Sequence, residues 1–225
     1  MLHKVGLPTF YGQAFLPDVC ELAPEMLPYT KRYFEEFLKT GTIREVRPSE
    51  LWYNSRTDFS PEALGTELPA HKNSGFELLQ GPAQFEGEIL GGCIDSMYEM
   101  FSGWRYGDMP EVCRKYGLFP SMDDWRGKIL LMESCEEYMP PETYKKALET
   151  LQETGVFDAV SGVLVGKPMD DMYHAEYKKL FVSIIANKEL PILCNINVGH
   201  AQPRCILPFG VPAHVDADAQ VIRFD

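Results

Sequence analysis

The chain has 225 residues, of which 45% are hydrophobic and 24% are charged, and this composition suits a folded protein of one large domain or two small ones. The formal net charge of −12 at pH 7 argues against a nucleic acid or an anionic membrane as a partner, because both select a basic surface. No apolar run reaches the roughly 18 residues of a membrane span, and the first residues lack the apolar stretch of a signal peptide.

The first forty residues predict a helix end, a strand and one clear helix. Residues 1–4 resemble the last turn of a helix that Gly6 closes as a C-cap, so the chain starts as if an upstream segment had been removed. Residues 7–11 predict a strand that ends at Gly12. Residues 24–41 predict a helix, and its aromatic side chains recur at helical spacing. We expect this aromatic stripe to pack in the core rather than to bind a ligand.

An irregular segment at residues 49–75 follows a short strand predicted at 42–46. Long loops in compact domains are usually functional or disordered, and the aromatic residues Trp52, Tyr53 and Phe59 favour order here.

A glycine pair stands after the next two predicted strands, at residues 76–79 and 83–90. Residues 91–93 (Gly-Gly-Cys) lead into a helix that runs to about Phe101. Glycines between a strand and a helix let backbone amides approach a ligand, or let neighbouring backbone pack closely, and both interpretations stay open. The spacing is not that of a GxGxxG loop, so a nucleotide-phosphate loop is not predicted.

The second half of the chain alternates apolar runs with helical patterns. The predicted elements are strand 128–132, helix 142–153 with Pro140 and Pro141 at its start, strand 160–165, helix 173–187 and strand 190–198. This alternation is typical of an α/β layer with parallel strands.

Two of these strands are followed by ionisable residues, Glu133 and His200. The carboxyl ends of parallel strands meet at one edge of a sheet, so the two side chains are expected to face each other. A carboxylate bonded to one imidazole nitrogen fixes the tautomer and leaves the other nitrogen as a base, which is one half of a hydrolytic triad. Taken alone, His200 also suits a turn or a packing position.

A nucleophile is harder to find than a base. No serine stands in a GxSxG elbow. Cys93 is the best candidate within the chain, although its Gly-Gly-Cys context suits plain packing as well. The six cysteines form no CxxC pair and His174, His200 and His214 are isolated in sequence, so we expect reduced thiols, a cytoplasmic location and no metal site.

The motifs together resemble the C-terminal portion of the LD-carboxypeptidase family of serine peptidases, especially its microcin-C-immunity (MccF-like) branch. The matching pieces are residues 6–12, 87–95, 127–133, 199–200 and 207–210. The resemblance implies a swivelling β/β/α-type domain and a Ser-Glu-His triad that works without metal or cofactor. It assigns the glutamate to Glu133 and the histidine to His200, and it puts the serine in an N-terminal domain upstream of this chain.

Three departures from the family pattern bear on activity. The domain with the serine and the oxyanion amides is lacking, Cys93 stands where the family often has Asn, and Ser134 stands where it often has Asp. Base and orienter without a nucleophile form no acyl-enzyme, so we expect the isolated chain to be inactive. We divide it into residues 1–80, the tail of the N-terminal domain with a helix and a connector, and 81–225, the C-terminal α/β domain.

The resemblance also implies substrates, namely L,D-tetrapeptides of the cell wall or aminoacyl-nucleotide analogues. It marks Gly91, Gly92, Cys93, Trp52 and Phe59 as candidate substrate contacts, while simple loop anchoring is an equally good explanation for the two aromatic residues. The partners expected are the missing domain and a second copy in a homodimer. A binding module without turnover is the alternative function, and hydrolysis with Cys93 as nucleophile is a third.

Overall fold

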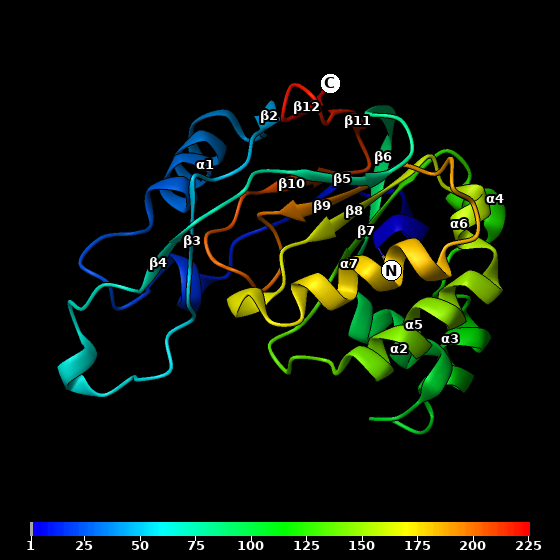
Figure 1. The fold of residues 1–225 in the computed structure, drawn as a ribbon, viewed down its shortest axis with the longest axis horizontal. Coiled ribbons are helices and arrows are strands. Elements are labelled where there is room, and N and C mark those ends of the chain that lie inside the picture. The colour runs from blue at the N-terminus through cyan, green and yellow to red at the C-terminus, as the bar shows by residue number, and fades with distance from the viewer. Residues whose placement is uncertain (1) are drawn as a thin grey trace.

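A computed structural model describes residues 2–225 of the protein (Figure 1). Met1, part of the predicted helix end, lies outside the described residues. Leu2–Val5 forms a 3-10 turn, and the N–H of Gly6 donates to the His3 carbonyl at 3.0 Å with a positive φ of 65° at Gly6. The glycine stop is therefore confirmed, although the turn before it is 3-10 rather than α-helical.

An eight-stranded sheet forms the centre, in the order β2-β12-β11-β6-β7-β8-β9-β5. Its middle is parallel, as predicted, and consists of β6 (Gln84–Cys93), β7 (Ile129–Glu133), β8 (Gly162–Gly166) and β9 (Ile192–Ile196). The residues of β7, β8 and β9 are all buried, because these strands are covered on both faces.

The sheet is mixed rather than purely parallel. β5 (Glu77–Gln80) pairs antiparallel with β9 at one edge, and β11 (Pro212–Asp216), β12 (Val221–Phe224) and β2 (Glu45–Val46) form an antiparallel flank beyond β6. Exposed and buried positions alternate along β11, which is the pattern of a strand with one solvent-exposed face. The sequence prediction missed β11 and β12.

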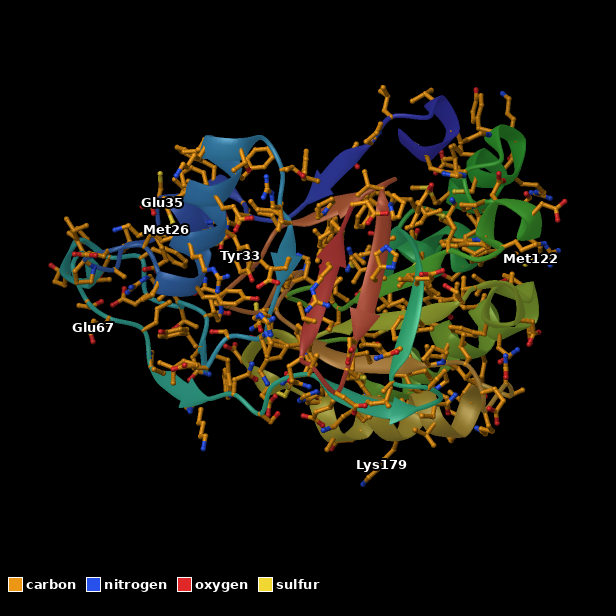
Figure 2. The ribbon with its side chains drawn as sticks, turned by 90° about the horizontal axis from the view of Figure 1, so that it is seen from above. Met26, Tyr33, Glu35, Glu67, Met122 and Lys179 are labelled. Atoms are coloured by element: carbon orange, nitrogen blue, oxygen red, sulfur yellow. The ribbon has the colours of Figure 1, made fainter. Side chains whose placement is uncertain are left out.

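Helices cover one face of the sheet (Figure 1). They are α2 (Ile94–Ser102), α3 (Met109–Tyr116), α4 (Met122–Trp125), α5 (Pro141–Thr154), α6 (Val156–Ala159) and α7 (His174–Ile184). Their apolar sides pack on alternate strand residues such as Leu130 and Met132, whereas Lys179 of α7 points away from the sheet (Figure 2). α3, α4 and α6 were not predicted.

The other face of the parallel strands carries a second core, to which α1 (Pro28–Thr40) and a two-stranded sheet contribute. In that sheet β1 (Thr9–Tyr11) pairs with β10 (Leu207–Phe209). The predicted aromatic stripe of α1 does pack, since Tyr33 is fully buried and points from α1 into the molecule (Figure 2). The helix begins at Pro28 rather than residue 24, because proline suits the first turn.

Two local predictions were wrong. Gly91 and Gly92 do not separate a strand from a helix, because β6 continues through Cys93. Gly91 has a φ of 138°, and a Cβ there would stand 2.1 Å from the Leu131 carbonyl oxygen, so the glycine is needed for the close approach of β7.

The segment at residues 49–75 is not wholly irregular either. It contains a hairpin of β3 (Leu51–Tyr53) and β4 (Ala70–Lys72), in which Trp52 stacks on His71 across the strands. The remaining short turns are Phe15–Val19, Pro61–Ala63 and Met169–Asp171. None of the helices among residues 2–225 has both the length and the hydrophobicity needed to cross a bilayer.

Candidate active site

Glu133 is a buried carboxylate at the carboxyl end of β7 in the middle of the sheet. Glycines on two neighbouring segments make room for its side chain. A Cβ on Gly166 would stand 2.7 Å from the Glu133 Cβ, and a Cβ on Gly199 would stand 2.4 Å from Oε2. Gly199 also has a positive φ of 89°, so both its conformation and its missing side chain are required for the carboxylate to lie here.

His200 meets this carboxylate, as the strand-end argument predicts. Its Nδ1 lies 2.8 Å from Oε2 of Glu133, and its side chain is 33% exposed while Glu133 has no exposure. An ionised carboxylate only accepts hydrogen bonds, so Nδ1 carries the proton. The pair therefore holds the imidazole in one orientation with Nε2 directed away from Glu133.

Tyr11 is hydrogen-bonded to the second oxygen of the Glu133 carboxylate. Its hydroxyl donates to Oε1 of Glu133 at 2.7 Å, and its ring stacks on Phe209 with the centroids 5.6 Å apart. Burial, together with the negative charge of Glu133, raises the pKa of Tyr11, so the phenol stays a donor. Sequence reasoning assigned Tyr11 no role, although it lies in the quoted segment 6–12.

Two acidic groups flank the imidazole. The hydrogen bond to Glu133 raises the pKa of His200, burial opposes the rise, and the negative charges of Glu133 and Glu136 add to it. Oε2 of Glu136 lies 3.1 Å from Nε2, and the Glu136 side chain is 62% exposed. The environment therefore favours the protonated ring more than water does.

A buried ion pair braces the backbone of His200. Nη2 of Arg204 donates to the His200 carbonyl at 2.8 Å, and Nη1 donates to Oδ2 of Asp18 at 2.6 Å. Oδ2 of Asp18 also accepts from the N–H of Ala14 at 2.7 Å. The turn that carries the histidine is thus tied to the segment after β1, which sequence reasoning did not predict.

A cavity of about 910 Å³ opens beside His200. Its lining is mainly apolar, and its polar lining residues include Glu136, Arg56 and Arg204. Arg56 is itself paired with Glu21, as Arg204 is with Asp18. The cavity is lined in part by His200 and has a volume typical of small-molecule sites.

A model of a known family, the LD-carboxypeptidase C-terminal domain, matches residues 86–215, which is more than half of the chain and includes both Glu133 and His200. The chain belongs to this family.

Relatives of this LD-carboxypeptidase-family chain include MccF-like proteins. The microcin C7 self-immunity protein MccF of Escherichia coli is 25% identical over 222 residues, which cover 96% of this chain and 58% of that protein. The crystal structure of an MccF-like protein from Streptococcus pneumoniae in complex with AMP is 58% identical, with a TM-score of 0.98, and the match covers 100% of this chain and 65% of that one.

A solved structure of the microcin C7 self-immunity protein MccF shares the fold at lower identity. The structure of MccF in complex with aspartyl sulfamoyl adenosine is 23% identical with a TM-score of 0.74, over 99% of this chain and 62% of that one. The chain thus spans about three fifths of the length of the relatives that it matches.

The remaining residues that were predicted as substrate contacts lie in different places. Phe59 lines the large cavity with its side chain 74% exposed. Trp52 is not among the residues that line it; its ring stacks on His71 and lies 4.8 Å from the Lys167 ammonium. Gly91 lines a smaller cavity of about 400 Å³, to which Tyr11 also contributes.

Cys93 stands beside Glu133 in the parallel ladder, but its thiol points elsewhere. Sγ donates to Oδ2 of Asp95 at 3.4 Å, and burial, followed by the charge of Glu133, raises the pKa of this thiol. A nucleophilic cysteine needs a lowered pKa and a nearby base. The geometry therefore favours packing over nucleophilic attack for Cys93.

Proposed function

We propose that this chain is the C-terminal part of a serine carboxypeptidase-type hydrolase, in which His200 is the general base and Glu133 orients it. The observation that carries the proposal is the 2.8 Å contact between Nδ1 and a carboxylate with no solvent exposure. Such a carboxylate fixes the tautomer and stabilises the imidazolium that forms when the base takes a proton.

The proposed reaction needs a serine from outside these 225 residues. Nε2 of His200 takes the proton of the serine hydroxyl as the oxygen attacks the amide carbonyl, and it then returns the proton to the leaving amine. Tyr11 holds the second Glu133 oxygen and prevents the carboxylate from rotating away. Glu136 occupies the Nε2 side here, but its side chain is largely exposed and free to move aside.

For substrates we propose small peptide or peptide-like amides, such as L,D-tetrapeptides or aminoacyl nucleotides. The support is the relatives' ligands, AMP and aspartyl sulfamoyl adenosine, and the size of the cavity beside His200. Phe59 offers an exposed ring on which a base can stack. Trp52 is a weaker candidate, because it does not line the large cavity and its ring already contacts His71 and the Lys167 ammonium.

The proposed organisation divides the chain as the sequence predicts, into residues 1–80 and 81–225. Exposed apolar side chains at Leu7, Phe10 and Leu16 are consistent with a covering partner, either the serine-bearing domain or a second copy in a homodimer.

The test joins the chain to the coding sequence upstream of Met1 and compares both forms on an L,D-tetrapeptide and an aminoacyl sulfamoyl adenosine. We expect turnover only in the extended form, and its loss in His200→Ala. His214→Ala is the matched control, because His214 also lies between two carboxylates, Glu86 and Asp225, but on β11 and outside the cavity lining. Equal activity in the two histidine variants would contradict the proposed base.

A ligand-binding module without turnover is the second candidate. It is favoured by the contact of Nε2 with Glu136, since no hydroxyl or thiol among residues 2–225 is hydrogen-bonded to the imidazole. Calorimetry with the same substrates separates the two. Binding without hydrolysis by the extended form supports the module, and hydrolysis that Cys93→Ala abolishes would instead support a thiol nucleophile.

A further inference from the structure

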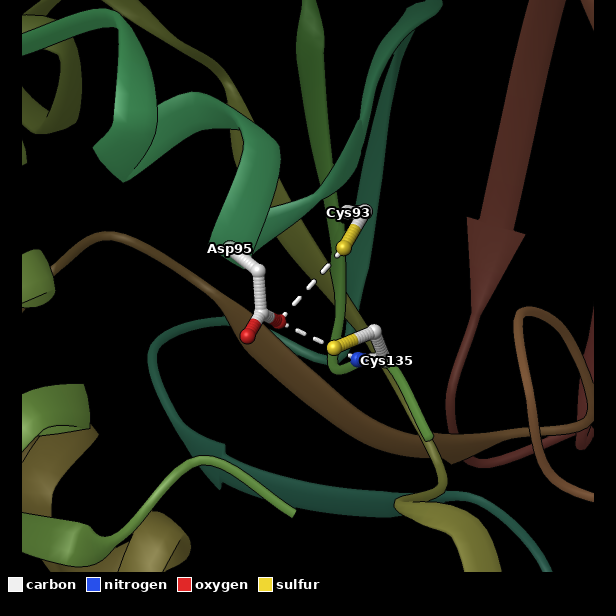
Figure 3. Close-up of side chains that lie close together, drawn as sticks. All are labelled: Cys93, Asp95 and Cys135. Carbon is white, nitrogen blue, oxygen red and sulfur yellow. Dashed lines mark hydrogen bonds between the residues drawn. The ribbon is translucent and has the colours of Figure 1, made fainter. Parts of the chain in front are cut away.

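Two thiols and a carboxylate from three segments meet at the carboxyl ends of β6 and β7 (Figure 3). Cys93 is the last residue of β6, Asp95 lies in the first turn of α2, and Cys135 follows β7 by two residues. The two sulfur atoms and a carboxylate oxygen all lie within 4.8 Å of one another. The hydrolytic mechanism proposed above uses none of these three groups.

The spacing of these atoms fits a thiophilic divalent ion. Tetrahedral zinc with bonds of about 2.3 Å to sulfur and about 2.0 Å to oxygen places a sulfur and an oxygen ligand about 3.5 Å apart, and two sulfurs about 3.8 Å apart. Cys93 Sγ already lies 3.4 Å from Asp95 Oδ2. The remaining pairs lie within 4.8 Å of each other and need to close by about 1.3 Å at most, which side-chain rotation supplies.

The electrostatic environment also suits a bound cation. Asp95 is only 4% exposed, and the hydrogen bonds that the described residues give it come from the Cys93 thiol and the Cys135 N–H, the latter at 3.1 Å. A buried carboxylate is costly unless hydrogen bonds and positive charge balance it, so a cation bound here would stabilise Asp95 further.

The positive charge of Arg105 would balance the net negative charge that remains on the site when a divalent ion is bound. An arginine keeps its guanidinium charged at physiological pH, and Arg105 lies in contact with Cys135. Two thiolates and one carboxylate leave a divalent ion with a net charge of −1, and Arg105 is close enough to balance it. Cys93 is only half-buried and provides the route of entry.

We propose that Cys93, Asp95 and Cys135 form a binding site for a thiophilic divalent metal ion such as Zn²⁺, with a fourth position open to water. Binding forms two metal–sulfur bonds and one metal–oxygen bond and releases the two thiol protons to solvent. Because Cys93 pairs with Glu133 across β6 and β7, the ion would bind one strand away from the His200 orienter.

The test is a titration of the reduced chain with Co²⁺, whose tetrahedral thiolate complexes absorb in the visible and in the ultraviolet. We expect one equivalent of Co²⁺ to give both absorption bands, and we expect Zn²⁺ to displace the bound Co²⁺. Cys93→Ser and Cys135→Ser should each weaken binding by more than the roughly 10- to 100-fold that outer-sphere changes typically cost. Asp95→Asn keeps an acceptor for the Cys135 N–H but lacks the charge, and should also bind more weakly. Cys20→Ser, which removes an exposed thiol of the large cavity, is the control and should bind normally.

A second measurement needs no variant and so does not depend on the folding of one. Zn²⁺ should slow alkylation of Cys93 and Cys135 in the unmodified chain, and leave Cys20 unprotected, as read by peptide mapping. Absence of a thiolate band with Co²⁺, survival of the band in the double variant of Cys93 and Cys135, or protection of Cys20 alone would overturn the proposal. None of these outcomes depends on hydrolytic activity, so the experiment can refute the metal site without refuting the proposed function, and the reverse.

Discussion

Gly199→Ala tests how tightly the glutamate and histidine are packed together. The added Cβ would stand 2.4 to 2.6 Å from three side-chain atoms of Glu133, at a position whose φ is 89°. The backbone conformation alone costs an L-residue about 1–2 kcal/mol. Overpacking in a closed site adds about 1–3 kcal/mol, and displacing the carboxylate weakens its hydrogen bonds as well. We expect a total loss of about 3–5 kcal/mol in the free energy of unfolding.

Gly65→Ala separates the two contributions. Gly65 has a similar φ of 80°, but a Cβ there would meet nothing within 4 Å. It should therefore lose only the backbone contribution of about 1–2 kcal/mol. The assay is urea unfolding of both variants, with the slope checked for constancy. Equal losses in the two variants would show that Glu133 is not confined by Gly199, and would refute the packing argument.

Three further predictions concern the charges around the site. Glu133→Gln should lower the pKa of His200, which an NMR titration of the imidazole would measure. In the unmodified chain the pKa of His200 is raised on folding. The Glu133–His200 pair therefore stabilises the fold fully below about pH 6.5, and this stabilisation is lost as the pH rises through the folded-state pKa. Tyr11→Phe should cost about 1–3 kcal/mol in unfolding free energy, because one oxygen of a buried carboxylate loses its donor. Arg204→Met should cost about 3–5 kcal/mol, because it leaves the carboxylate of Asp18 buried and without its partner.

The two substitutions that test stability, Tyr11→Phe and Arg204→Met, have matched controls at less buried positions. Tyr138→Phe removes a hydroxyl bonded to the half-buried Asp170 and should cost less than Tyr11→Phe. Arg126→Met breaks a pair with Asp123 in which both side chains are largely exposed, and should change stability by less than about 0.5 kcal/mol. A loss for Tyr11→Phe or Arg204→Met no larger than that of its control would contradict the reasoning, and so would a His200 pKa that Glu133→Gln leaves unchanged.

The sequence predicted those parts of the fold and site that depend on local pattern. Apolar runs ending at Glu133 and near His200 identified two parallel strands, and the rule that parallel strands end at one edge brought these residues together. The error at Gly91 has a local cause, since a glycine pair looks the same in sequence whether it forms a loop or admits a neighbouring strand.

The parts that could not be predicted depend on contacts between distant segments. Tyr11 meets Glu133 across 122 residues, and Asp18 meets Arg204 across 186. The periodicity of apolar residues along the sequence does not predict such contacts, because they depend on the strand order of the whole sheet. The strands β11 and β12 were missed because His214 and Arg223 interrupt their apolar residues, whereas the equally short β7 and β8 begin as fully buried, apolar runs.

The two-sided hold on Glu133 has a consequence for how the chain folds. One carboxylate oxygen is hydrogen-bonded to Tyr11 near the start of the chain, and the other to His200 near its end. Closing such long loops is entropically costly and comes late, after local helices and the β6–β7 pairing have formed. Until then the carboxylate remains in water, and the histidine titrates as it does in an unfolded peptide. The imidazole resonance of His200 should therefore be among the last signals to reach its native position during refolding, which makes it a reporter of completed folding.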